Sequence, residues 1–187
     1  HPPPPRGDGV SALVVVEGAD GTGKSTVARA LAVALADLGA RAWHHGPPLP
    51  MRPRDPWSMA LHYAAERASL AAAMREWTEA PVVIADRWWH TAAVFGAVRV
   101  SFAEIDLAAA EEKALPAPVL VVILDAPDAV LAARRPDASP DEVSARAAYR
   151  RHARRWQWGP VVNANRPVAE VVAEVEALAR RALRGAP

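Results

Sequence analysis

A glycine-rich segment near the start of the chain restricts its fold more than any other feature of the sequence. Residues 18–25 read GADGTGKS and match the pattern GxxxxGK[ST] at every fixed position. The apolar run Ala12–Val16 precedes this segment, and an Ala-rich stretch, Ser25–Leu38, follows it with the composition of a helix. A strand, a glycine-rich loop and a helix in this order form the context in which such a loop binds the phosphates of a nucleoside triphosphate.

The residue types of this loop suit that role. Glycine permits backbone turns that let successive N–H groups face phosphate oxygens, and the positive end of the following helix adds to the anion site. Lys24, one of only two lysines, is expected to reach the β- and γ-phosphates, and the Ser25 hydroxyl is expected to bind Mg²⁺. We therefore predict ATP as the phosphoryl donor and Mg²⁺ as the cofactor. The predicted ATP-binding residues are Gly18, Asp20, Gly21, Thr22, Gly23, Lys24, Ser25 and Thr26.

Composition limits what else the chain can be. With 187 residues, of which 51% are hydrophobic and 23% charged, the chain fits one globular domain. Lys+Arg (22) and Asp+Glu (21) nearly cancel, so the formal net charge of +1 excludes attraction of nucleic acid or anionic lipid by bulk charge. Cysteine is absent, which excludes disulfides and thiolate metal sites, and no apolar run approaches the roughly 20 residues that span a bilayer. We expect a cytoplasmic protein without a membrane partner.

The order of apolar and Ala-rich stretches predicts an α/β fold. We expect a disordered lead-in over residues 1–9, which include four consecutive prolines, and a single domain over residues 10–187. Short β-branched runs between helical stretches are typical of a doubly wound sheet, here of five parallel strands. The predicted strands are Ala12–Val16, Ala40–His44, Val82–Asp86, Val119–Asp125 and Val161–Asn163. The predicted helices are Ser25–Leu38, Trp57–Trp77, one from Ser101 toward Leu115, one that begins at Ser139, and Pro167–Leu183, with a proline-rich surface loop over residues 45–56.

Four segments together resemble the thymidylate-kinase-like nucleoside monophosphate kinases of the P-loop superfamily. They are EGADGTGKST (17–26), LHYAAERA (61–68), DRW (86–88) and LDAPDAVLAARR (124–135), in the order of that family. The resemblance implies a P-loop kinase fold and transfer of the ATP γ-phosphoryl to a deoxynucleoside monophosphate. It also implies a homodimer, since relatives in the family are commonly dimeric.

Three charged residues are candidates for the centre of such a site. The resemblance implies that Asp20 contacts the acceptor sugar 3′-hydroxyl, although an Asp-Gly pair is also typical of an exposed turn. Asp86 ends an apolar strand, where its carboxylate could hold Mg²⁺-bound water or orient the acceptor phosphate. Arg87 offers a bidentate fork to that phosphate, and the alternative is an internal Asp–Arg ion pair. The predicted metal ligands are Ser25 and Asp86.

An aromatic residue and an arginine share one face of the helix predicted over Trp57–Trp77. Tyr63 and Arg67 are four residues apart, so they could grip a flat base, and the resemblance implies that Tyr63 stacks on it and Arg67 bonds its edge. The alternative is a core contact and a solvated tip. Ala92 and Phe95 stand where the family carries groups that read thymine, and neither can hydrogen-bond a base. The predicted acceptor-binding residues are Asp20, Tyr63, Arg67, Arg87, Trp88, Thr91 and Phe95.

Arginines beyond the fourth strand could supply charge to the transferring phosphoryl. The resemblance implies a mobile lid, here short and near residues 134–140, whose arginine acts as an arginine finger. Arg134 and Arg135 are the first candidates, with Arg146 and Arg150 on the next helix. The basic face over residues 150–155 is otherwise a solvated surface. The predicted catalytic residues are Lys24, Asp86, Arg87, Arg134 and Arg135.

Two other classes of function fit parts of the same sequence. The first is a P-loop kinase of a hydroxyl acceptor, either a nucleoside, a hydroxymethylated base (free or in DNA) or a small metabolite, with Asp86 as the base. The second is a non-catalytic nucleotide- or nucleic-acid-binding module that uses the basic face. His44 and His45 depart from the family's pattern; two adjacent histidines are a poor metal site, and they could instead touch the acceptor phosphate or cap the loop.

Overall fold

A five-stranded, all-parallel sheet forms the centre of the computed structural model, which describes residues 12–44, 55–76 and 81–185. The strands lie in the order β2-β3-β1-β4-β5. Their bounds are β1 (Ala12–Gly18), β2 (Ala40–Trp43), β3 (Val82–Asp86), β4 (Leu120–Asp125) and β5 (Val161–Asn163). The predicted α/β class with five parallel strands is confirmed.

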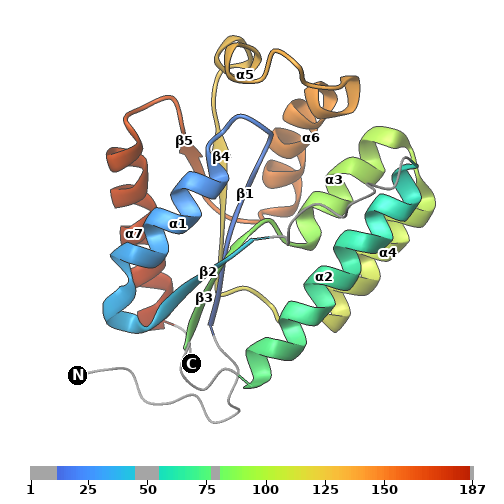
Figure 1. The fold of residues 1–187 in the computed structure, drawn as a ribbon. Coiled ribbons are helices and arrows are strands. Elements are labelled where there is room, and N and C mark those ends of the chain that lie inside the picture. The colour runs from blue at the N-terminus through green and yellow to red at the C-terminus, as the bar shows by residue number, and fades with distance from the viewer. Residues whose placement is uncertain (1–11, 45–54, 77–80, 186–187) are drawn as a thin grey trace.

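Seven α-helices in the described residues connect and cover these strands (Figure 1). They are α1 (Lys24–Ala34), α2 (Pro56–Glu76), α3 (Trp89–Arg99), α4 (Phe102–Ala114), α5 (Asp128–Arg134), α6 (Pro140–Trp156) and α7 (Val168–Gly185). Helices α1 and α7 cover one face of the sheet, and α2, α3, α4 and α6 lie on the other side. Helices on both faces make the sheet doubly wound, as predicted.

Strand β1 is apolar along most of its length because both of its faces are covered. All seven of its residues are buried, which is the pattern expected of a central parallel strand. Val14 and Val16 belong to the core beneath α1 and α7, whereas Leu13 and Val15 belong to the core that includes Met74 of α2. Successive side chains of a strand point to opposite faces, so this one strand anchors both layers of helices.

Most element boundaries agree with the sequence, and the exceptions have local causes. The helix predicted over Ser25–Leu38 is two segments, because α1 ends at Ala34 and a 3-10 turn, η1 (Ala36–Leu38), follows it. Gly39 then ends the turn in a left-handed conformation with φ of 67°. Helix α3 was not predicted, since its residues carry neither a capping signal nor a clear helical period.

Two helix starts predicted from capping boxes are confirmed. The Ser101 side chain accepts a hydrogen bond from the Glu104 N–H at the start of α4. At the start of α6, Ser139 and Glu142 bond each other's backbone N–H groups, with Pro140 as the first helical residue. The lead-in over residues 1–9, His45 and most of the predicted proline-rich loop lie outside the described residues.

No helix among the described residues combines the length and the apolar character that a membrane crossing needs.

One glycine shows how closely the loop before β5 approaches the sheet. A Cβ atom at Gly159 would overlap the carbonyl oxygen of Val121 in β4. We expect Gly159→Ala to lower the free energy of unfolding by about 2 kcal/mol or more, because backbone must move to relieve the overlap. Gly185→Ala is the matched control, since nothing lies within 4 Å of its Cβ position, and it should leave stability unchanged or slightly raised. Denaturant unfolding of both variants measures the difference, and equal stabilities would contradict this packing.

Candidate functional site

The glycine-rich loop has the backbone that its sequence predicts. Gly18 ends β1 with φ of 137°, and a Cβ there would overlap the carbonyl oxygen of Leu124 in the neighbouring strand β4. Gly23 precedes α1 with φ of 90°, a left-handed conformation that favours glycine. The chain can therefore turn sharply from β1 into the N-terminus of α1, where backbone N–H groups without helical partners favour an anion.

Lys24 is buried inside this turn with its charge partly compensated. Its Nζ donates to the Ala19 carbonyl oxygen at 2.9 Å and lies 3.5 Å from the Asp20 carboxylate. Burial, together with repulsion from Arg87, lowers the pKa of Lys24 to about 8. An anion next to Nζ would offset burial and the repulsion from Arg87, and would stabilise the charged form of Lys24. The turn is therefore suited to binding a polyanion. Thr22 supports the same turn, since its hydroxyl donates to the Ala19 carbonyl oxygen at 2.8 Å.

Ser25 and Asp86 form a second contact between the loop and β3. The Ser25 Oγ donates to Asp86 Oδ2 at 2.5 Å, and His44 Nδ1 lies 3.2 Å from the same oxygen. Within the described part of the chain, the other carboxylate oxygen, Asp86 Oδ1, is buried without a partner. These are oxygen ligands of the kind Mg²⁺ prefers, and Mg²⁺ commonly takes only one or two protein ligands beside waters and phosphates. The pair fits the predicted metal site.

Larger metal-binding groups do not occur among the residues that the structure describes. No three His, Cys, Asp or Glu side chains gather there in a way that could hold a metal ion.

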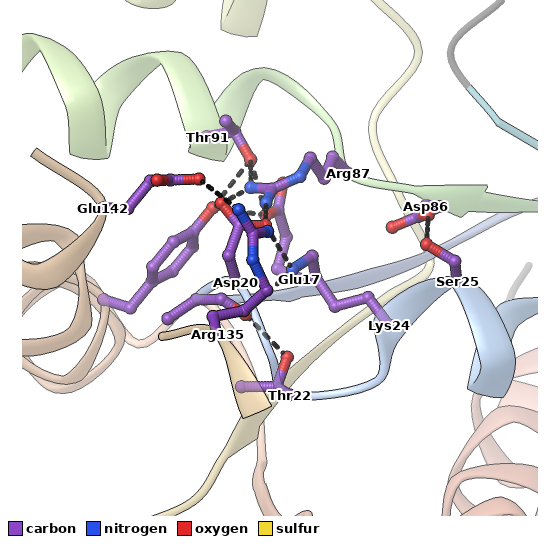
Figure 2. A network of polar contacts seen from close by, with 12 residues as sticks. Glu17, Asp20, Thr22, Lys24, Ser25, Asp86, Arg87, Thr91, Arg135 and Glu142 are labelled. Atoms are coloured by element: carbon purple, nitrogen blue, oxygen red, sulfur yellow. Dashed lines mark hydrogen bonds and ion pairs between the residues drawn. The ribbon is translucent and has the colours of Figure 1, made fainter. Parts of the chain in front are cut away.

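Arg87 lies beside the loop, close to Asp20 and Thr91 (Figure 2). Its backbone has φ of 75°, unusual for a residue with a side chain, and its N–H donates to the Val16 carbonyl oxygen at 3.0 Å. Nη2 pairs with Asp20, and Nη1 donates to Thr91 Oγ1 at 3.2 Å and to the Tyr149 hydroxyl at 3.0 Å. The predicted alternative, an ion pair between Asp86 and Arg87, is not found among the described residues, since Arg87 pairs with Asp20 instead.

Asp20 is therefore not an exposed turn residue. Burial opposes its ionisation, yet the positive charges of Arg87 and Lys24 lower the pKa of Asp20 to about 2. At neutral pH its carboxylate is an anion that partly neutralises the two cations nearest to the loop.

Sequence analysis missed Glu17, the most buried acid of the site. Its carboxylate is inaccessible to solvent and accepts from the Trp88 N–H at 2.7 Å, from Thr91 Oγ1 at 2.8 Å and from the Tyr149 hydroxyl at 3.0 Å. Burial raises the pKa of Glu17, and the Arg87 charge and these three hydrogen bonds oppose the rise. The signal that could have revealed it is the one used for Asp86, namely an acid at the carboxyl end of a buried apolar strand.

A cavity of about 350 Å³ opens beside the loop, between α2, α3, α4 and the start of α6. Six of the seven predicted acceptor-binding residues line it: Asp20, Tyr63, Arg67, Arg87, Thr91 and Phe95. The exception is Trp88, whose side chain is fully buried in the core and packs edge-on against Trp43 at 6.4 Å. The prediction that the Trp88 side chain binds the acceptor is therefore wrong, because its indole faces the sheet rather than the cavity.

Arg67 has a buried partner that the sequence did not reveal. Its Nε and Nη2 donate to the two carboxylate oxygens of Glu111 in α4, at 2.6 and 2.8 Å, and only 1% of the residue is exposed. The alternative of a solvated tip is thus wrong. Two of the donors of Arg67 are already used by Glu111, so a ligand in the cavity would meet an ion pair rather than a lone arginine.

The arginines near the predicted lid differ in their surroundings. Arg134 at the end of α5 donates from Nη1 to the Gly21 carbonyl oxygen at 3.2 Å, so it lies directly on the loop. Arg135 pairs with Asp137 at 3.0 Å and with Glu142 at 3.4 Å. Arg150 is bound by two acids, Asp125 and Asp128, each at 2.9 Å, and Arg146 is buried.

Thr26, a predicted ATP-binding residue, is exposed in the first turn of α1.

Comparison with protein-family models and with curated proteins gives no match for this chain.

The Arg67–Glu111 pair gives a prediction about stability. Arg67→Met should lower the free energy of unfolding by about 3–5 kcal/mol, because it leaves the Glu111 charge buried without a partner. The double variant Arg67→Met/Glu111→Leu should recover most of this loss, since two apolar side chains can pack where the ions were. Urea unfolding measures both. The surface pair Arg166 and Glu174 is the control, where Arg166→Met should cost less than about 1 kcal/mol, and a double variant no more stable than Arg67→Met would contradict this account.

Proposed function

We propose that this protein is an ATP-dependent phosphotransferase with a P-loop fold, which transfers the γ-phosphoryl of ATP to the phosphate of a nucleoside monophosphate. The observation that carries the proposal is the position of Arg87. Its guanidinium lies between a phosphate-binding type of loop and a cavity of about 350 Å³ with aromatic walls, a size suited to a small ligand. A donor phosphate on one side and an acceptor phosphate on the other would meet at this residue.

The loop residues form the donor side. The N-terminus of α1 and the turn before it would bind the triphosphate, and Lys24 would exchange the Ala19 carbonyl oxygen for β- and γ-phosphate oxygens. Ser25 and Asp86 would hold Mg²⁺, which when bound neutralises charge on the phosphates. Of the two lid candidates, Arg134 is the one with a hydrogen bond to the loop among the described residues, from Nη1 to the Gly21 carbonyl oxygen, and it could carry charge to the transferring phosphoryl.

The cavity forms the acceptor side. Arg87 would bind the acceptor phosphate, Tyr63 and Phe95 would flank the base, and Asp20 would accept from a sugar hydroxyl. In the reaction, an oxygen of the acceptor phosphate forms a bond to the γ-phosphorus as the bond to the bridging oxygen of ADP breaks. The acceptor oxygen is already an anion, so no proton has to be removed. Catalysis then consists of positioning and charge neutralisation.

The positions of the carboxylates favour this acceptor over a hydroxyl. A hydroxyl acceptor needs a base, and Asp86 contacts Ser25 and His44 instead of lining the cavity. Asp20 does line it, but a carboxylate with a pKa of about 2 is a weak base at neutral pH. Glu104 and Glu142 line it as well, and they are held in ion pairs with Arg99 and Arg135. The binding-module alternative is also less favoured, because Arg150 in its basic face is neutralised by Asp125 and Asp128. A homodimer and a cytoplasmic location remain parts of the proposal, and sedimentation and cell fractionation test them.

Release of ADP in a coupled assay tests the proposed function. We expect Mg²⁺-dependent turnover with a subset of nucleoside monophosphates, and none with nucleosides or oligonucleotides. Lys24→Ala should reduce the rate by about 100-fold or more, because the transferring phosphates lose their buried cation. Lys113→Ala is the matched control, since it removes the other lysine of the chain from the exposed end of α4, and its rate should equal that of the wild type. Turnover with oligonucleotides alone, or undiminished activity of Lys24→Ala, would contradict the proposal.

Arg87→Ala separates the two sides of the site. We expect kcat/KM for the acceptor to fall by about 100-fold or more, since the acceptor phosphate loses a bidentate partner, while the Kd for Mg·ATP changes less than about threefold. Steady-state kinetics and equilibrium binding measure the two quantities, with Arg166→Ala, at an exposed ion pair, as the control. A loss of ATP affinity in Arg87→Ala would assign this arginine to the donor side instead.

A further inference from the structure

We infer that Glu17 is a positioning residue that, through the hydroxyls of Thr91 and Tyr149, fixes which edge of the Arg87 guanidinium faces the acceptor phosphate. This inference rests on the proposed function for the identity of the acceptor group. The contacts that carry it are properties of the protein alone.

The Glu17 carboxylate joins three elements that carry the acceptor side. It extends from the end of β1, bonds the Trp88 backbone between β3 and α3, and reaches Thr91 on α3 and Tyr149 on α6. The Trp88 N–H donates to Oε1, whereas both hydroxyls donate to Oε2. Of the other ionisable groups around it, His90 has Nδ1 at 3.9 Å, and burial lowers the pKa of His90 to about 3, so this imidazole is neutral.

The direction of the hydroxyl protons determines what the two hydroxyls can offer to Arg87. A hydroxyl has one proton and two lone pairs. When its proton points to Glu17, a lone pair is left to accept from Arg87 Nη1, and both hydroxyls lie within 3.2 Å of that nitrogen. Thr91 and Tyr149 are also 2.7 Å from each other, so one of the two hydroxyl protons can lie between them while the other points to Glu17. In either arrangement each oxygen keeps a lone pair for Nη1, and the two oxygens approach that nitrogen from the same side.

Occupation of Nη1 leaves one edge of the guanidinium for a ligand. Nη1 donates to both hydroxyls, which lie together on one side of it. Nη2 pairs with Asp20, and no bond among the described residues engages Nε, so the Nε–Nη2 edge is the one a phosphate can approach. Bidentate binding of phosphate requires two parallel N–H groups in one plane, so a rotated guanidinium would lose one of them.

Tyr149 gives this arrangement a link to the lid region. It is 2% exposed and lies on α6, whose first turn contains Glu142, the partner of Arg135. A shift of α6 would therefore move a hydroxyl that orients Arg87. The same carboxylate thus connects the strand before the phosphate loop with the helix after the lid.

Glu17→Gln tests the inference because it changes one proton position at nearly constant shape. The Trp88 N–H requires an acceptor at Oε1, so the amide nitrogen of Gln must take the place of Oε2, where it donates to the hydroxyls. One hydroxyl proton can then lie between Thr91 and Tyr149, but the other turns toward Arg87 Nη1 and repels it. We expect kcat/KM for the acceptor to fall by about 10- to 100-fold with an unchanged Kd for Mg·ATP. Asp37→Asn, at an exposed ion pair with Arg180, is the control and should leave both values unchanged.

Two further measurements keep the outcome decisive. In an Arg87→Ala background, Glu17→Gln should change kcat/KM by less than about twofold, since its effect passes through the guanidinium. Crystal structures of Glu17→Gln and of Tyr149→Phe should show the guanidinium rotated, and they require no turnover. An unrotated guanidinium in both variants, or additive losses in the double variant, would overturn the inference even if the wild type is an active kinase. An inactive wild type with a rotated guanidinium in the variants would instead overturn the proposed function and leave this positioning intact.

Discussion

Parallel pairing of β1 with both β3 and β4 is the constraint on which the rest of the site depends. The register aligns Val16 with Asp86 and Gly18 with Leu124, so the carboxyl ends of three strands meet at one edge. A Cβ atom at Gly18 would overlap the Leu124 carbonyl oxygen, so glycine is required where the backbone passes β4. Ligands of doubly wound sheets bind at such an edge, so the candidate site follows from the topology before any side chain is considered.

The charges at this edge form a balanced set that a substrate would rearrange. Lys24 and Arg87 are cations with little access to solvent, and the protein compensates them with Asp20 and Glu17. Such compensation is needed because an unpaired buried charge costs several kcal/mol, typically about 3–5 when its partner is removed. Phosphate groups can take over the role of Asp20, whereas Glu17 lies too deep for exchange. Asp20 is thus suited to being replaced by a substrate phosphate, whereas Glu17 is suited to holding the site in position.

The sequence predicted those features that depend on residues close together along the chain. The turn of the glycine-rich loop, all five strand positions and both capping boxes belong to this class, because glycine spacing, apolar runs and N-cap residues act locally. The partners of Arg67 and Glu17 could not be predicted, since Glu111 and Tyr149 lie 44 and 132 residues away and come close only through packing of helices. Trp88 illustrates the same limit, because the sequence does not determine whether the indole of a tryptophan next to a site faces the core or the cavity.

Calorimetric titration of the protein with Mg·ATP tests the central claim, that the buried lysine of the loop binds a polyphosphate, most directly. The free protein holds Lys24 with a pKa of about 8, and a phosphate beside it restores the charged form. We predict saturable binding at one site, with uptake of a proton at pH 9 that makes the observed heat depend on the ionisation enthalpy of the buffer, and little such dependence at pH 7. Absence of saturable heat, or binding at pH 9 without proton uptake, would contradict the account.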